Sequence, residues 1–179
     1  PAFIAADFLS QAEHGMDSQA MLVTASESIV EPVMQAIREQ LDRLPRKEIT
    51  EKSLSHSRLI VLKDKQEVID FTNLYAPEHL IIQTTDYADI AGQVENAGSV
   101  FMGPYTPESA GDYASGTNHT LPTNGYAKAY SGVNLDSFIK KITFQEITAD
   151  GIRLLGGTIW TMAANEQLDA HKNAVTIRL

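Results

Sequence analysis

The sequence predicts an α/β fold in which helices cover both faces of a mostly parallel sheet, followed by a mainly helical C-terminal tail. Helical and strand patterns alternate over the first 115 of the 179 residues. The strand candidates are short and continuously apolar, which is typical of strands buried on both faces of a parallel sheet. Short connections join the two kinds of element, which indicates successive βαβ units.

The first helix and the first strand follow directly from the start of the chain. Apolar residues at helical spacing predict a helix over residues 3–14, and Ala20–Thr24 is predicted to be a short buried strand. Ser28 and Glu31 have the spacing of a capping box, so we expect them to begin a second helix. That helix should end at Pro45 and bury one apolar face, formed by Ile29, Val33, Ile37, Leu41 and Leu44.

A second strand, Arg58–Leu62, is followed by a helix whose N-terminus is marked by Asp64 and Glu67. We expect this helix to end before Pro77, because proline disfavours helical backbone in the residue that precedes it. It should bury four side chains: Val68, Ile69, Leu74 and Tyr75. A third strand, His79–Gln83, comes next.

The α/β pattern ends with one more helix, one more strand and a helix start. A helix is predicted over Tyr87–Ala97 with Gly98 as its stop, followed by a strand at Ser99–Met102. The tripeptide at 106–108, Thr-Pro-Glu, has the order expected for the N-cap, N1 and N2 positions of a further helix.

The composition changes after this point. Residues 111–134 contain four Gly, three Thr and three Asn, and they form a functional loop, a linker, or both. Residues 135–179 show a short amphipathic helix at Leu135, a strand-like segment over 142–147 and two helical stretches around residues 156–157 and 165. A tail of this length cannot bury a core of its own, so it must dock on its own domain or on a second subunit.

Charge and cysteine content exclude several classes of function. The chain has 14 basic and 23 acidic residues, a net charge of −9, which argues against nucleic acid or an anionic membrane as the partner. It has no cysteine, which excludes disulfides, a thiol nucleophile and thiolate metal sites. Any metal must therefore be bound by His, carboxylate or amide groups. We see no apolar run of membrane-spanning length and no signal peptide, and we expect a cytoplasmic protein.

Two pairs of residues are the first candidates for chemistry. Gln11 and His14 are three residues apart on one helix face, where they could offer an amide oxygen and an imidazole nitrogen to one cation. Alternatively, His14 lies on a solvated helix end, where the helix dipole favours it. Glu78 and His79 precede a buried strand and could form an acid–base pair, although this dipeptide is common by chance.

The remaining candidates lie in the Gly-rich segment and in the tail. Asp112 and His119 belong to the segment whose backbone freedom lets polar side chains turn inward. Glu166 and His171 flank an expected helix break, and they could act together only across that break. We expect His56 to be solvated. Taken together, His, Asp and Gln without Cys suit a cation such as zinc, and the common nucleotide-loop, metalloprotease and serine-hydrolase motifs are absent.

Several segments, taken together, resemble the C-terminal part of the histidinol dehydrogenase family. They occur in the order of that family and cover most of the chain. These stretches are FLSQAEHGMDSQA (8–20), LYAPEHLII (74–82), AGSVFMGPYTPESAGDYASGTNHTLPTNGYA (97–127), SGVNLDSFIKK (131–141) and LDAHKNAVTIRL (168–179).

The resemblance implies a role for each candidate. The zinc ligands would be Gln11, His14, Asp112 and His171. Glu78 and His79 match the catalytic pair of the family. The substrate would be contacted by the zinc ligands and by His79, His119 and Glu166. In this family the tail is exchanged between the subunits of a homodimer, so Glu166 and His171 would complete the site of the partner subunit.

The resemblance also implies an activity and a division into domains. The reaction is the oxidation of L-histidinol to L-histidine through the aldehyde, with reduction of two NAD⁺. Residues 1–131 would be the C-terminal half of a Rossmann-like sheet domain that carries the catalytic and zinc residues, and residues 132–179 a dimerisation tail. The NAD site is expected in a part of the family that this chain does not match. Because the chain starts at Pro1 with a helical pattern, we expect a fragment that produces no NADH by itself.

Two other functions are compatible with the same residues. The chain could be a stand-alone zinc-binding dimerisation module without catalysis, which would bind zinc and not recognise histidinol. It could also be a zinc hydrolase in which Glu78 activates a water molecule. The second reading is less favoured, because hydrolytic zinc sites usually keep a more open coordination set.

Overall fold

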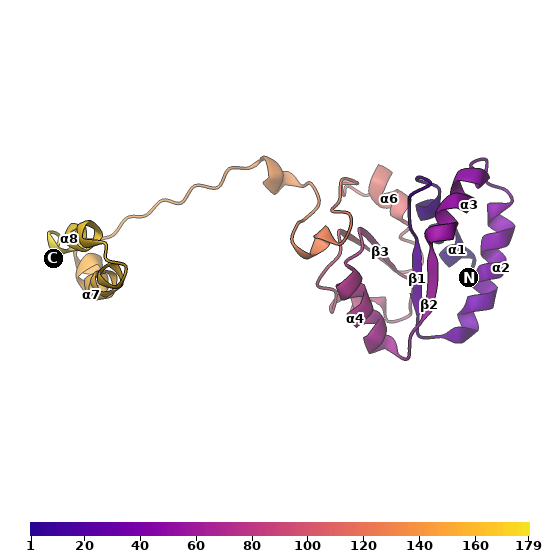
Figure 1. Ribbon diagram of the computed structural model, residues 1–179. Coiled ribbons are helices and arrows are strands. Elements are labelled where there is room, and N and C mark those ends of the chain that lie inside the picture. Colours follow the sequence, from indigo (N-terminus) through magenta and orange to yellow (C-terminus); the bar gives the residue numbers. More distant parts are fainter. The chain divides into compact units, whose positions relative to one another are not determined.

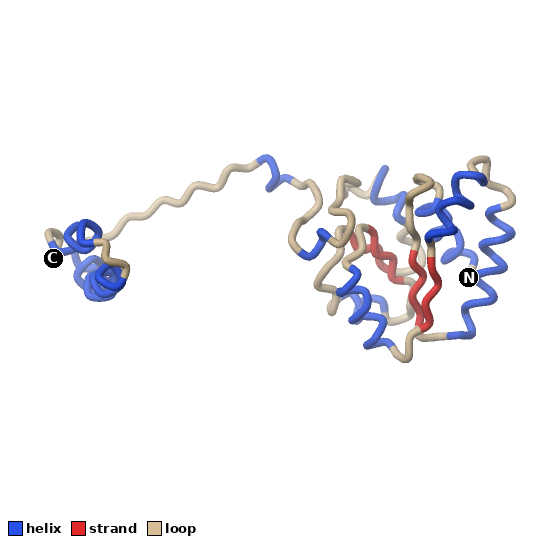
Figure 2. The backbone as a smooth tube through the Cα atoms, in the orientation of Figure 1, coloured by secondary structure: helices blue, strands red, loops and turns tan.

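The computed structural model describes all 179 residues as two compact units, residues 1–138 and residues 139–179 (Figure 1). All four strands lie in the first unit (Figure 2), which confirms the predicted α/β class. None of the helices is both long and apolar enough to cross a membrane. The functional division expected between residues 131 and 132 stays a prediction.

The strands form two parallel pairs. β1 (Met21–Thr24) pairs with β2 (Arg58–Val61), and β3 (His79–Ile82) pairs with β4 (Ser99–Met102). The pairs are separate two-stranded sheets in the hydrogen-bonding pattern. All four strands lie where the apolar runs predict them; the Rossmann-like character of the complete sheet stays a prediction.

The first core lies between helices and the β1–β2 pair. α1 (Ala2–Ala12), α2 (Val30–Leu41) and α3 (Lys47–His56) lie to one side of these strands, and α4 (Lys65–Tyr75) lies to the other (Figure 1). The buried centre of this core consists of Ala5, Leu9, Val33 and Ile37. Burial of these side chains attaches α1 to α2, and so determines where the C-terminal end of α1 lies.

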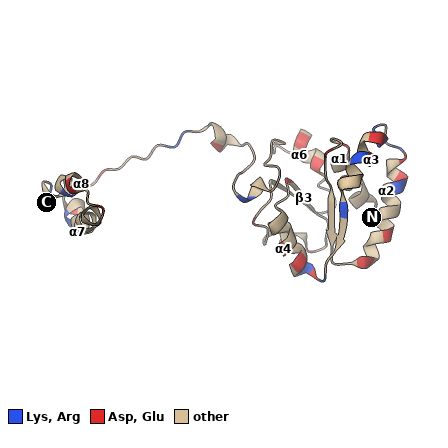
Figure 3. Cartoon of the chain, viewed as in Figure 1, with Lys and Arg blue, Asp and Glu red and all other residues tan.

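A second, smaller core joins α4, β3 and α5 (Tyr87–Ala91) through Ile69, Ile82 and Ile90. α6 (Glu108–Tyr113) follows β4. It carries acidic residues and no basic residue, as Figure 3 shows. The first unit ends with two 3₁₀ turns, η2 (Tyr126–Lys128) and η3 (Leu135–Phe138).

The predicted capping box at Ser28 and Glu31 is wrong. Residues 27–29 form a 3₁₀ turn, η1, and α2 continues from the helical backbone of Ile29 without a side-chain cap. The Ser28 hydroxyl contacts Ser26 at 2.9 Å, and Glu31 pairs with Arg38 at 3.1 Å. A short 3₁₀ turn at a helix start leaves no separate N-cap position for Ser28 to occupy.

The predicted second helix is too long, since α2 ends at Leu41, before Pro45. The sequence argument also did not predict α3, which begins at Lys47, after that proline. α3 buries Thr50 and Ser53 in place of apolar side chains. The hydroxyl of Thr50 donates to the carbonyl of Arg46 at 3.1 Å, and that of Ser53 donates to the carbonyl of Ser18 at 2.9 Å. A helix with such a buried face has no apolar periodicity, so the sequence pattern does not reveal it.

The helix start at Asp64 is confirmed, because its carboxylate accepts a hydrogen bond from the backbone N–H of Glu67 at 3.0 Å. The helix ends at Tyr75, before Pro77, as expected. The predicted burial of Leu74 and Tyr75 is wrong, since they are 71% and 38% exposed. They follow Ile69 by five and six residues, which turns both away from its buried face.

Two other helix boundaries differ from prediction. α5 ends at Ala91 rather than at residue 97, because the side chain of Asn73 accepts the backbone N–H groups of Glu95 and Asn96 at 2.7 and 3.3 Å. α6 begins at Glu108 with Pro107 as its N-cap. Thr106 is therefore not the cap; its hydroxyl donates to the carbonyl of Met102 at 2.8 Å.

The second unit consists of α7 (Ala149–Asn165) and α8 (Asp169–Thr176). The turn between them confirms the predicted helix break, and it contains Gln167 with a φ of 59°. The two glycines at 156–157 lie inside α7. The predicted strand over residues 142–147 is absent and its side chains are exposed, since an apolar alternation forms a strand only where a neighbouring strand pairs with it.

Candidate active site

The end of α1, the start of β3 and one face of α6 bring the candidate residues together. Gln11 lies in the last turn of α1, and His14 follows its end. His79 is the first residue of β3. Glu108 and Asp112 are four residues apart on α6, so their side chains share one helix face.

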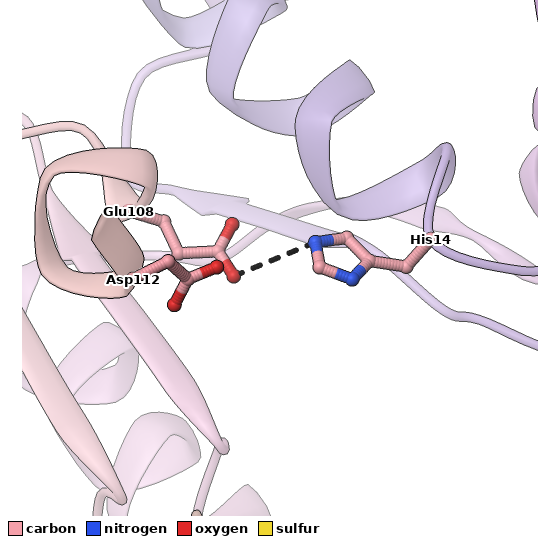
Figure 4. Close-up of side chains that lie close together, drawn as sticks. All are labelled: His14, Glu108 and Asp112. Atoms are coloured by element: carbon pink, nitrogen blue, oxygen red, sulfur yellow. Dashed lines mark ion pairs between the residues drawn. The ribbon is translucent and has the colours of Figure 1, made fainter. Parts of the chain in front are cut away.

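His14, Glu108 and Asp112 form a cluster in which three ligand atoms lie within 4.8 Å of one another. His14 points from α1 toward the two carboxyl groups of α6 (Figure 4). Its Nε2 atom is 3.7 Å from Oε1 of Glu108. One imidazole and two carboxyl groups at this spacing are a donor set that suits zinc or another cation with N and O ligands.

His79 lies against the same carboxyl group. Its Nε2 atom is 3.2 Å from Oε1 of Glu108, and the side chains of His79 and Glu108 are 12% and 2% exposed. Three buried polar atoms on these elements make no hydrogen bond: Gln11 Nε2, His79 Nε2 and Glu108 Oε1. Because buried polar atoms are normally hydrogen-bonded, these three indicate a site that a bound group completes.

Burial controls the protonation of Glu108. It raises the pKa of this carboxyl to about 7, and the negative charges of Asp112, Glu78 and Asp7 act in the same direction. A carboxyl with such a pKa carries a proton at mildly acidic pH and gains a favourable partner when a cation binds nearby.

Burial also acts on the candidate acid–base pair. It raises the pKa of Glu78, with His14 opposing and Asp112 adding to the rise. Burial lowers the pKa of His79, against the pull of Asp112 and together with the repulsion from His14. His79 is therefore neutral at pH 7 and able to accept a proton, which is the state required of a general base.

The structure brings five predicted site residues into one region of the first unit: Gln11, His14, Glu78, His79 and Asp112. His119 is exposed in the loop after α6. Glu166 and His171 lie on either side of the break between α7 and α8, in the second unit. The roles of these last three residues stay predictions.

The sequence argument missed Glu108 as a functional residue and used it only to mark a helix start. A signal was present: Glu108 and Asp112 have the i, i+4 spacing that places two carboxyl groups on one helix face. The burial of Glu108, 2% exposed, could not be read from that spacing.

Known proteins share this sequence and this fold. The family model for histidinol dehydrogenase matches residues 1–179. Histidinol dehydrogenase of Bacteroides fragilis strain YCH46 is 66% identical over the whole chain, which covers 42% of that protein. The chloroplastic histidinol dehydrogenase of Arabidopsis thaliana is 57% identical over the whole chain, which covers 39% of it.

The crystal structure of histidinol dehydrogenase from Elizabethkingia anophelis matches with a TM-score of 0.94 and 56% identity, covering 99% of this chain and 41% of that one. This chain thus spans about two fifths of the length of these relatives. Because the family model matches every residue, the chain belongs to the histidinol dehydrogenase family.

Proposed function

We propose that this chain supplies the metal ligands and the acid–base residues of a zinc- and NAD-dependent histidinol dehydrogenase, which oxidises L-histidinol to L-histidine in histidine biosynthesis. The observation that carries the proposal is the cluster of His14, Glu108 and Asp112 beside His79, with three buried polar atoms that lack a hydrogen bond. The family of the chain supports the same reaction.

The residues fit a zinc ion, with the ligands Gln11, His14, Asp112 and His171. Gln11 lies on α1, and His14 follows the end of that helix. Asp112 lies on α6 and His171 on α8. Nε2 of Gln11 is buried and makes no hydrogen bond, and the oxygen of the same amide is the atom that would bind the metal. When bound, zinc would supply a Lewis acid that orients the substrate.

The acid–base residues divide two oxidation steps between them. In the first step, neutral His79 accepts the proton of the substrate hydroxyl while hydride passes to NAD⁺, and the aldehyde forms. In the second step, Glu78 accepts a proton from water as the water oxygen adds to the aldehyde. The hydrate then loses a hydride to a second NAD⁺ and its remaining acidic protons to solvent, which leaves the carboxylate. Both residues are partly buried, which limits the number of water molecules that can compete for these proton transfers.

The proposal extends to the assembly. We propose a homodimer in which the tail, residues 132–179, is exchanged, so that Glu166 and His171 reach the site of the partner subunit. His119 and Glu166 would then contact histidinol together with the zinc ligands. A cytoplasmic location and an NAD site outside the matched part of the family stay predictions.

Calorimetric titration of L-histidinol into the zinc-loaded chain tests the proposal. We expect binding by the unsubstituted chain and at least about a tenfold loss of affinity in His14→Asn and Asp112→Asn, because each variant loses a ligand. His56→Asn is the matched control, since His56 is exposed and lies outside the cluster. Zinc binding without any heat from histidinol would favour the alternative of a metal-binding dimerisation module.

A further inference from the structure

We propose that Glu108 is a positioning residue for His79: it orients the imidazole ring and selects which ring nitrogen carries the proton. The inference rests on the proposed function in one respect, namely that His79 is the base. The contact itself is a feature of the structure. Oε1 of Glu108 lies 3.2 Å from Nε2 of His79, and neither atom has a hydrogen-bond partner.

Packing leaves the ring of His79 little freedom to turn away from Glu108. Its centroid lies 6.1 Å from the ring of Phe101, with an angle of 39° between the planes. Phe101 is 5% exposed and lies on β4, in register with Ile81 of β3. A ring that is bounded by a buried aromatic side chain and by a buried carboxyl group has few alternative orientations.

The helix that carries Glu108 is held against the same aromatic ring. At Gly111, an added Cβ would lie 2.6 Å from Cε1 of Phe101, so only glycine permits this approach of α6. Glu108 is three residues earlier on α6 and is 2% exposed. Phe101 thereby fixes both members of the contact, the imidazole of His79 directly and the carboxyl of Glu108 through Gly111.

The consequence for His79 follows from the chemistry of a carboxylate beside an imidazole nitrogen. An ionised carboxylate 3.2 Å from Nε2 favours the tautomer with hydrogen on Nε2, which presents Nδ1 as the base. Once His79 has accepted a proton, the same carboxylate stabilises the imidazolium. Three other charged groups act on His79 or its neighbours: Asp112 from α6, His14 from the end of α1, and Glu78, which precedes β3.

The test is ¹H–¹⁵N spectroscopy of the histidine side chains in the metal-free 179-residue chain at pH 8.5, where carboxylic acids are ionised. His79→Asn assigns the His79 signals. We expect the unsubstituted chain to show His79 predominantly in the Nε2–H form. In Glu108→Gln we expect the Nε2–H preference of His79 to weaken toward an even mixture of the two neutral tautomers.

Glu95→Gln is the matched control, since it removes an exposed carboxylate and should leave the His79 signals unchanged. Unchanged signals in Glu108→Gln, or an even mixture of tautomers in the unsubstituted chain, would overturn the inference. The second result needs no variant, so the proposal remains testable if Glu108→Gln does not fold. The spectra do not involve histidinol, so a failure of the proposed function appears separately, as absence of histidinol binding.

Discussion

At the scale of single residues, the buried carboxyl group of Glu108 makes the stability of the metal-free chain depend on pH. Its pKa is about 7 in the folded chain against 4.5 for an exposed glutamate. The folded state therefore holds a proton that the unfolded state has lost. The free energy of unfolding contributed by this group falls as pH rises from about 4.5 to about 7, by roughly 3 kcal/mol.

His79 has the opposite effect on the pH dependence of stability. Burial lowers its pKa, so its contribution to the free energy of unfolding is lost as pH falls below the usual pKa of an exposed histidine. The difference between the unsubstituted chain and Glu108→Gln isolates the carboxyl. Urea unfolding at pH 5 and pH 7.5, with EDTA, is the measurement. We expect the decrease in the free energy of unfolding with rising pH to be absent in Glu108→Gln. Equal pH dependence of the two proteins would contradict the burial of Glu108.

Two similar helix-start patterns in the sequence have different outcomes in the structure. They show when neighbouring residues alone are sufficient to predict where a helix starts. Asp64 and Glu67 form the expected helix start because the cap involves only neighbouring residues. Ser28 and Glu31 match a capping box equally well, yet a 3₁₀ turn takes its place. The sequence signal is similar in the two cases, and the conformation of the preceding backbone decides between them.

At the scale of elements, the approach of α6 to β4 controls the geometry of the site. Gly111→Ala places a methyl group 2.6 Å from the Phe101 ring, so α6 or Phe101 must move. We expect a loss of about 1–3 kcal/mol in the free energy of unfolding, as for overpacked cores. We also expect zinc affinity to fall, because Asp112 moves with α6. Thermal unfolding and a chelator competition assay measure the two effects.

Gly157→Ala is the matched control for this substitution. An added Cβ at Gly157 meets no atom within 4 Å, and the residue lies inside α7. Alanine should stabilise that helix by up to about 1 kcal/mol and leave zinc binding unchanged. Equal behaviour of the two variants would show that the contact between Gly111 and Phe101 does not position α6.

Elements with an apolar stripe were predictable, and elements without one were not. The four strands are continuous apolar runs and lie where expected. α3 was missed because it buries Thr50 and Ser53, whose hydroxyls bond to backbone carbonyls. α5 is shorter than expected because Asn73, distant in sequence, accepts the N–H groups of two residues that would otherwise continue the helix.

At the scale of the whole molecule, the second unit presents apolar side chains that its own packing leaves exposed. Phe144 and Leu154 are 91% and 84% exposed. If the tail forms the dimer, Phe144→Ser with Leu154→Ser should shift the chain toward monomer, because apolar area is lost from the interface alone. Both side chains are exposed here, so we expect no loss of fold.

Sedimentation velocity of the double variant, with circular dichroism as the check on folding, measures this shift. Glu146→Ser is the matched control, since it changes an exposed polar residue of the same segment. A dimer that persists unchanged in the double variant would contradict the proposed role of residues 132–179. A monomeric unsubstituted chain would contradict it as well.

The sequence by itself determined the α/β class, the four strands, the exclusion of cysteine chemistry and the family resemblance, because these depend on composition and local pattern. It also proposed Gln11, His14, Glu78, His79 and Asp112 as site residues. Only the tertiary structure decided that Glu108 belongs with them. Its burial and its contact with His79 arise where α1, β3 and α6 meet, and a contact between elements remote in sequence leaves no periodic signal in the chain.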